Sequence, residues 1–331
     1  MGAAAGAIAE RRLVDRPRRP RRPLDAPLGA LRGTPVTVRT ADGVDLHVEV
    51  DEARAAAPTV IFVHGYALNL DCWHYQRLAL RGYRRTVFYD QRSHGRSGRS
   101  ERELSTIEQL GEDLLQVIET VAPEGPLVLV GHSMGGMTIM ALAHAHPEIF
   151  TDRVVAVSLI STSAGDLGAV RLGLPGLPGR AALRLTPGVV ATLARAPRLV
   201  ESGRRAGSDL GYLLTARYAF GGAVDSALVD FTDQMLAGTP VSVVADFFPD
   251  FAVYEQYDAL KALYDIHTLV VCGTRDAITP VQHSRKLREL LPSAELCELE
   301  GAGHMVILER ADEVNRALAD LLRRADAEAH Q

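Results

Sequence analysis

Cysteine is scarce in this sequence, with only Cys72, Cys272 and Cys297 among 331 residues. Three scattered cysteines are too few for a disulfide framework, and their spacing is not that of a metal site. We therefore expect no metal ion. This cysteine usage fits a reducing compartment, and we expect the protein to be cytoplasmic.

Long apolar runs are also missing. The sequence has no stretch of about 20 apolar residues, the length that is needed to span a bilayer. Residues 1–9 are apolar but short, and an Arg- and Pro-rich stretch follows them. We expect residues 1–33 to be a disordered leader. The alternative is the end of an apolar anchor that associates the protein with a membrane, with the arginines on the cytoplasmic side.

Net positive charge is confined to the N-terminal segment. Residues 1–34 contain eight arginines and three acids, so a net charge of −5 for the whole chain leaves about −10 for the remainder. Such a body offers no basic face, and we expect no nucleic-acid partner. The sequence also has no P-loop and no G-x-G-x-x-G after a strand, so we expect no nucleotide cofactor.

Apolar runs that alternate with helical patterns dominate the rest of the chain, which predicts a mostly parallel sheet covered on both faces. Asp42-Gly43 between two alternating segments predicts a hairpin at one edge. The predicted strands are 36–39, 46–50, 59–63, 86–89, 126–130, 154–160, 267–272 and 294–299. The predicted helices are 71–81, 106–121, 137–144, 281–291 and 306–325.

Residues 164–255 interrupt this alternation. They begin with a Gly/Pro-rich run at 172–179 and then show helical stretches near 187–200, 208–219 and 226–237, followed by an aromatic group at 247–251. We interpret this interval as a helical cap, or lid, inserted into a core formed by residues 34–163 and 256–325. Its apolar content predicts an apolar substrate pocket.

The motif most informative about function is Gly131-His-Ser-Met-Gly135, which stands between a predicted strand and a predicted helix. A serine in G-x-S-x-G at such a junction is typical of a nucleophile elbow, a turn so tight that glycines must flank it. The turn exposes the hydroxyl of Ser133 and places it at a helix N-terminus.

A serine nucleophile needs a base, and the base needs an acid to orient it. Asp276 follows the penultimate strand and His304 follows the last one, so both belong to the edge where parallel strands end. The order Ser133, Asp276, His304 is the order of such triads in this arrangement. Asp166, after the strand ending at Ile160, is the alternative acid.

Two backbone N–H groups are expected to bind the developing oxyanion. One belongs to Met134, the residue after the nucleophile, and the other to Tyr66, in the loop after strand 59–63. We expect His64 to brace that loop, and Arg92 to pair with Asp90.

Together, His64-Gly65, the segment Asp90–Ser97, the elbow, Gly273-x-x-Asp276 and Gly301-x-Gly-His304 resemble the α/β-hydrolase superfamily over residues 34–325. The resemblance is strongest to its serine branch of esterases, lipases and haloperoxidase-like enzymes. It implies an eight-stranded α/β-hydrolase fold with an inserted cap. It also implies a cofactor-independent enzyme that cleaves the carboxylic ester of a small, apolar molecule.

Several functions remain open on the same motifs. A thioesterase, lactonase, C–C hydrolase, peptidase or acyltransferase would carry the same triad. A ligand-binding protein without turnover would also resemble this chain. The natural substrate and the oligomeric state are not predicted by the sequence.

Overall fold

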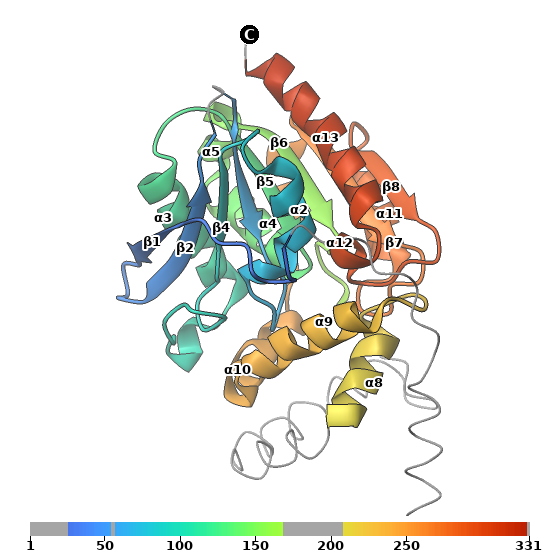
Figure 1. The fold of residues 1–331 in the computed structure, drawn as a ribbon. Coiled ribbons are helices and arrows are strands. Elements are labelled where there is room, and N and C mark those ends of the chain that lie inside the picture. The colour runs from blue at the N-terminus through green and yellow to red at the C-terminus, as the bar shows by residue number, and fades with distance from the viewer. Residues whose placement is uncertain (1–25, 54–56, 168–207, 330–331) are drawn as a thin grey trace, which may run out of the picture.

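The computed structural model describes residues 26–53, 57–167 and 208–329 (Figure 1). Its eight strands form one sheet in the order β1-β2-β4-β3-β5-β6-β7-β8. The strands are β1 (Thr34–Arg39), β2 (Asp45–Asp51), β3 (Thr59–Val63), β4 (Thr86–Tyr89), β5 (Leu127–His132), β6 (Val154–Ile160), β7 (His267–Gly273) and β8 (Glu295–Leu299). The strands from β3 to β8 pair in parallel, and the β1–β2 hairpin joins β4 antiparallel. The predicted fold class is confirmed.

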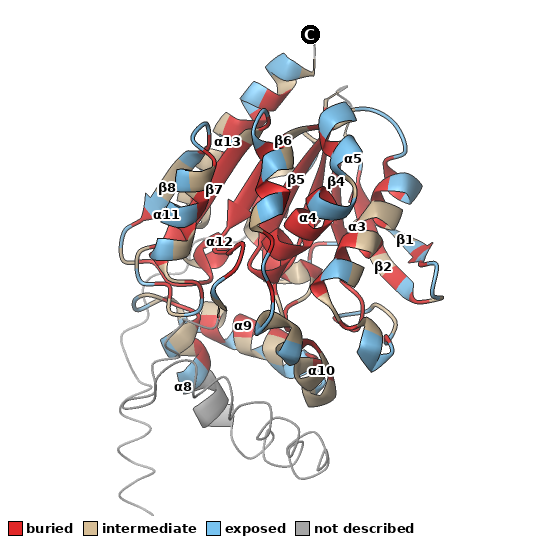
Figure 2. Cartoon of the chain, turned by 180° about the vertical axis from the view of Figure 1, so that it is seen from behind, coloured by how far each residue is buried: buried red, intermediate tan, exposed pale blue. Residues whose placement is uncertain are grey.

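Apolar residues occupy both faces of the central strands because helices cover both faces. In β3, Val60 and Phe62 pack into one cluster, while Ile61 and Val63 pack into the other. One face carries α3 (Ile107–Val121), α4 (Met134–Ala145), α5 (Pro147–Asp152) and α11 (Val281–Leu290), as Figure 2 shows. The other carries α2 (His74–Leu80), α12 (Val306–Glu309) and α13 (Ala311–Glu328) (Figure 1).

Among the described residues, three α-helices lie between β6 and β7 in the chain. They are α8 (Ser208–Tyr218), α9 (Ser226–Gly238) and α10 (Val241–Phe251), and they gather at one end of the sheet (Figure 1). The helices predicted at 208–219 and 226–237 are therefore present. The helix predicted near 187–200 and the Gly/Pro-rich run at 172–179 lie outside the described residues.

Two predicted helices are each divided. The helix predicted at 71–81 begins as a 3₁₀ turn, η1 (Leu70–Trp73), capped by the side chain of Asn69, before α2 continues it. The helix predicted at 306–325 breaks at Arg310, whose backbone is not helical (φ −128°, ψ 43°). Short 3₁₀ turns at η2 (Arg102–Leu104) and η4 (Tyr257–Leu263) complete the described elements.

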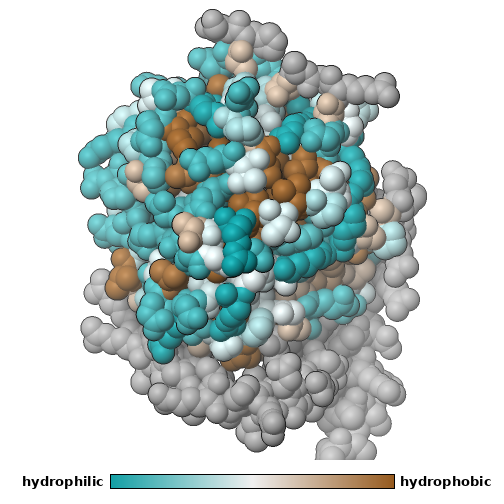
Figure 3. Space-filling model, turned by 90° about the vertical axis from the view of Figure 1, so that its left-hand side faces the viewer, coloured by the Kyte–Doolittle hydropathy of each residue, from teal (hydrophilic) through white to brown (hydrophobic). Residues whose placement is uncertain are grey.

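The face shown in Figure 3 is mainly hydrophilic, with apolar side chains gathered in separate patches. Among the described residues, no helix has both the length and the apolar character needed to cross a bilayer.

Candidate active site

The turn after β5 holds Ser133 in a backbone conformation that is rare for a residue with a side chain (φ 55°, ψ −120°). Close approach of neighbouring chain makes this turn possible. A Cβ atom on Gly135 would lie 2.0 Å from the carbonyl oxygen of Val63, and one on Gly131 would lie 2.5 Å from that of Gly135. Both positions therefore require glycine, as the sequence motif predicts.

The Ser133 hydroxyl lies within hydrogen-bond distance of His304. The Oγ atom is 2.9 Å from Nε2 of the imidazole, and Nδ1 of the same ring is 2.8 Å from Oδ2 of Asp276. The exposed fractions are 8%, 6% and 5% for Ser133, His304 and Asp276, so little water competes for these contacts. The structure thus brings the three predicted residues into one row, with the imidazole between the hydroxyl and the carboxylate.

Asp276 is held as an acceptor by four donors. Besides Nδ1 of His304, its carboxylate accepts the N–H groups of Ile278 (2.8 Å) and Thr279 (2.9 Å) and the hydroxyl of Thr279 (2.9 Å). Burial acts to raise the pKa of this carboxyl, but the neighbouring His304 and these hydrogen bonds outweigh it and hold the pKa below its usual value. Asp276 is therefore ionised at neutral pH.

Thr279 is a site residue that the sequence reasoning missed. Its hydroxyl lies 2.9 Å from Oδ2 of Asp276, 2.9 Å from the carbonyl oxygen of Ser161 and 3.3 Å from Nδ1 of His304. Only part of the signal was available in the sequence, because a loop aspartate typically accepts backbone N–H groups a few residues later, whereas nothing local marks the threonine hydroxyl.

The loop that carries His304 is fixed by Glu309, a second residue missed from sequence. Its buried carboxylate accepts the N–H groups of Gly303 (2.8 Å) and Gly221 (3.0 Å), so it joins this loop to the chain after α8. On the other side, Nε2 of His132 contacts the carbonyl oxygen of His304 (3.0 Å). These contacts orient the imidazole toward Ser133.

His64 braces the loop after β3, as predicted. Its Nδ1–H donates to the carbonyl of Gly65 (2.8 Å), and its Nε2 accepts the N–H of Gln91 (2.9 Å). Burial lowers the pKa of this imidazole to about 4, so the ring is neutral at neutral pH.

The N–H groups of Tyr66 and Met134 were predicted to bind an oxyanion. In residues 26–53, 57–167 and 208–329, neither N–H has a hydrogen-bond acceptor. Met134 is the first residue of α4, so its N–H is one of those that a helix leaves without an internal partner. In the parts of the chain that the structure describes, both donors are free to bind a ligand.

The expected Arg92–Asp90 pair is wrong. Arg92 instead donates to Asp113 (2.6 Å) and to Asp42 (2.9 Å), whereas Asp90 accepts the N–H groups of Leu70 and Arg96. The Asp90 carboxylate thus joins its own loop, at Arg96, to the start of η1, at Leu70. The alternative acid, Asp166, has a different partner: its carboxylate accepts a hydrogen bond from the hydroxyl of Tyr257 (2.7 Å).

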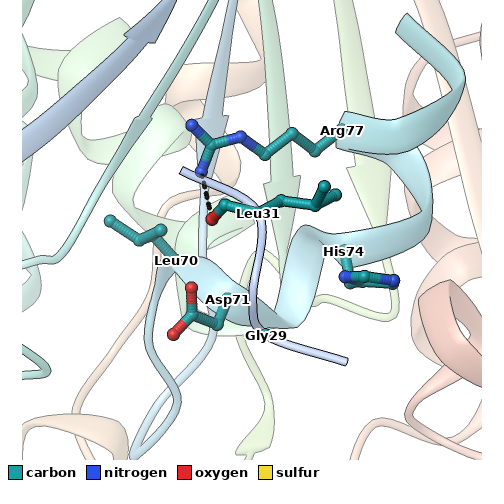
Figure 4. Close-up of a pocket in the computed structure, with 6 residues that line it drawn as sticks. All are labelled: Gly29, Leu31, Leu70, Asp71, His74 and Arg77. Atoms are coloured by element: carbon teal, nitrogen blue, oxygen red, sulfur yellow. Dashed lines mark hydrogen bonds between the residues drawn. The ribbon is translucent and has the colours of Figure 1, made fainter. Parts of the chain in front are cut away.

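A shallow recess lies where residues 29–31 cross α2 (Figure 4). Leu31 passes over this helix, and its carbonyl accepts a hydrogen bond from Arg77 (3.3 Å). None of the lining residues is Ser133, His304 or Asp276, so the recess is not part of the candidate site.

Within the described part of the chain, no group of three His, Cys, Asp or Glu residues could hold a metal ion.

Comparison with known proteins identifies the family of this chain. Residues 60–317 match the model of the alpha/beta hydrolase family. The chain belongs to this family. It is therefore a hydrolase.

Two curated relatives illustrate the range of activities among similar chains. The acetyltransferase component of an acetoin cleaving system from Pseudomonas putida is 29% identical over 268 residues, which cover 80% of this chain and 63% of that protein. The chain thus spans less than two thirds of that relative. A non-heme chloroperoxidase from Kitasatospora aureofaciens is 28% identical, with 86% of this chain and 98% of the relative covered.

Solved structures show the same fold. An enol-lactonase from Burkholderia xenovorans superimposes with a TM-score of 0.69 at 25% identity, covering 87% of this chain and all of that one. An esterase from a Rhodococcus species superimposes with a TM-score of 0.70 at 23% identity, covering 88% and 98%.

Proposed function

We propose that this hydrolase is a serine esterase that cleaves a carboxylic ester through an acyl-enzyme. The observation that carries the proposal is the row in which His304 lies 2.9 Å from the Ser133 hydroxyl and 2.8 Å from the Asp276 carboxylate. These are hydrogen-bond distances that permit proton transfer.

The proposed reaction has two halves. In the first, the Oγ of Ser133 attacks the ester carbonyl while Nε2 of His304 takes its proton and then passes it to the leaving alcohol. In the second, His304 takes a proton from water and the resulting hydroxide equivalent attacks the acyl carbonyl. The bond to the Oγ of Ser133 then breaks as His304 returns the proton to that oxygen, and the free acid leaves. Asp276 fixes the tautomer of His304 and stabilises its positive charge. The N–H groups of Tyr66 and Met134 stabilise the oxyanion in both halves.

An apolar acyl group suits the surroundings of the elbow. Met134 and Met137, next to Ser133, belong to one apolar cluster with Val243 and Phe247 of α10. We propose that α8–α10 form part of a cap over the core and that their apolar side chains contact the acyl chain. The division into a core (34–163 and 256–325), a cap (164–255) and a leader (1–33) is part of this proposal.

Ester hydrolysis is tested with p-nitrophenyl acetate, butyrate and octanoate. We expect kcat/KM to rise with acyl length and turnover to be lost in Ser133→Ala and His304→Ala. Ser293→Ala is the matched control, because Ser293 is exposed and bonded only to the carbonyl of Tyr264 among the described residues. A flat or falling profile would contradict the apolar pocket.

Parallel assays test whether the same three residues cleave a bond other than a carboxylic ester. Two assays are the most informative, because the relatives include an acetyltransferase component and an enol-lactonase: acyl transfer to an added alcohol, and opening of a lactone. Faster turnover of a thioester, a lactone or a C–C substrate would replace the ester proposal. A ligand that raises the melting temperature of the wild type without being consumed would favour a binding role.

A further inference from the structure

The side chain of Tyr66 contacts α10, one of the helices α8–α10 inserted between β6 and β7, which we call the inserted helices. Its hydroxyl donates a hydrogen bond to the carbonyl oxygen of Val244 in α10. Its ring packs edge-on against Phe251 at the end of the same helix, with 5.0 Å between ring centroids. One residue therefore offers its backbone N–H to the site and its side chain to α10.

The rest of the loop is tied to the same helices. The carbonyl of Ala67 accepts the hydroxyl of Thr239, which lies between α9 and α10, at 3.0 Å. The buried ring of His94 lies 5.5 Å from that of Phe247 and 6.3 Å from that of Tyr66. The loop after β3 is thus attached to α10 and to the turn before it.

This loop also needs support from outside. Ala67, the residue after Tyr66, has a positive φ of 58°. A non-glycine residue adopts this conformation only where surrounding contacts hold it there. The peptide plane that carries the Tyr66 N–H lies one residue before this turn, so contacts that hold the turn in place also restrict the direction of that N–H.

We infer that Tyr66 is a positioning residue whose hydroxyl, by holding the Val244 carbonyl, sets its own backbone N–H in the place where an oxyanion would form. The inference rests on the proposed function and deepens it. On this inference, α10 helps to stabilise the transition state by positioning the Tyr66 N–H, in addition to any contact that the inserted helices make with substrate.

The hydroxyl is suited to this task. Burial raises the pKa of Tyr66 above the usual range, and the negative charge of Asp246 adds to the effect. The group therefore remains protonated and able to donate throughout the pH range in which an esterase works.

Tyr66→Phe isolates the hydroxyl, because phenylalanine keeps the ring packing and the backbone N–H. We expect kcat for p-nitrophenyl butyrate to fall about tenfold, less than the 10²–10³-fold that removal of an oxyanion donor costs. We expect KM to change less than about twofold, because the ester carbonyl of the ground state gains little from this donor. Titration of active sites with a fluorophosphonate corrects kcat for any unfolded fraction.

A second readout reports on the oxyanion itself. The ketone 1,1,1-trifluorodecan-2-one should add to Ser133, with the serine proton passing to His304 and the ketone oxygen becoming an oxyanion. Its affinity should fall in Tyr66→Phe by the same factor as kcat/KM. Tyr257→Phe is the matched control, since it also loses one hydrogen-bonded hydroxyl, at 2.7 Å from Asp166. This variant should behave as the wild type.

The inference is overturned if Tyr66→Phe keeps wild-type kcat and ketone affinity, or if only KM rises, since the hydroxyl would then serve packing or substrate binding. It is also overturned if Tyr257→Phe loses as much as Tyr66→Phe. An inactive wild type that takes up no fluorophosphonate would instead show that the proposed function has failed, and the inference would fail with it.

Discussion

The Nε2 atom of His304 lies 2.9 Å from the Oγ atom of Ser133, although 171 residues separate them in the chain. They meet because β5 and the loop after β8 end at the same edge of a sheet whose strands run parallel. The strands from β5 to β8 must therefore be paired before this contact exists. Activity is therefore a sensitive measure of correct assembly of the sheet.

Thr279 provides the first test of how the acid is held. Thr279→Val removes the hydroxyl that lies 2.9 Å from Asp276 and keeps the shape of the side chain. We expect kcat/KM for p-nitrophenyl butyrate to fall about tenfold, which corresponds to one hydrogen bond to a charged group. Thr279→Ser should restore most of the activity, and Thr120→Val, at an exposed helical threonine, should change nothing. Equal losses in Thr279→Val and Thr279→Ser would contradict a role for the hydroxyl.

Three buried histidines predict acid sensitivity of the fold. Burial lowers the pKa of His64 to about 4, and burial together with a neighbouring histidine lowers those of His94 and His132 to about 3, from an ordinary value of 6.5. Each is neutral in the folded chain and takes up a proton on unfolding below pH 6.5. The stabilisation they contribute is therefore complete above about pH 6.5 and is lost as the pH falls toward 4.

The slope of this loss can be measured by urea unfolding at several pH values. Three protons correspond to about 4 kcal/mol of unfolding free energy per pH unit between about pH 5.5 and 4.5. His94→Gln should reduce the slope by about a third. His144→Gln is the control, because His144 is exposed in the folded chain. A slope that His94→Gln leaves unchanged would show that another group takes up the proton.

Arg92 is expected to be essential for stability and not for chemistry. Its guanidinium is fully buried between Asp113 and Asp42. Arg92→Met leaves the Asp113 carboxylate buried without its partner, which costs about 3–5 kcal/mol of unfolding free energy. Arg39→Met, in an exposed pair with Asp45, should leave that free energy nearly unchanged. Urea unfolding with similar losses in both variants would contradict this assignment.

The elbow glycine Gly135 should tolerate no side chain. A Cβ atom there would lie 2.0 Å from a backbone oxygen of β3, which cannot move without disturbing the sheet. We expect Gly135→Ala to lower the unfolding free energy by about 3 kcal/mol and to abolish turnover. Gly238→Ala meets no atom within 4 Å and should be neutral or slightly stabilising. Thermal unfolding and ester turnover check both variants, and an active, stable Gly135→Ala would contradict the tight turn.

The strands were predictable because their signal is local. The segments 59–63, 86–89 and 154–160 are mostly apolar, and the structure gives them the same bounds. The proximity of Ser133, Asp276 and His304 was predictable from the sequence, because each follows a strand of one parallel sheet. Their chain order then left few other arrangements.

What the sequence did not reveal depends on contacts between distant segments. The partners of Arg92 come from the hairpin and from α3, and no spacing near Arg92 identifies either. Glu309 and the hydroxyl of Tyr66 act across 88 and 178 residues, so no local motif could show what they bind. The break at Arg310 has no local signal either, because nothing in the residue type forbids a helix there.

The account is tested most directly by locating the nucleophile. The folded wild type is treated with a fluorophosphonate, and the modified peptide is identified by mass spectrometry. The account predicts one adduct, on Ser133, which is lost in Ser133→Ala, strongly slowed in His304→Ala and unchanged in Ser293→Ala. An adduct on another residue, or none on folded protein that hydrolyses esters, would contradict it.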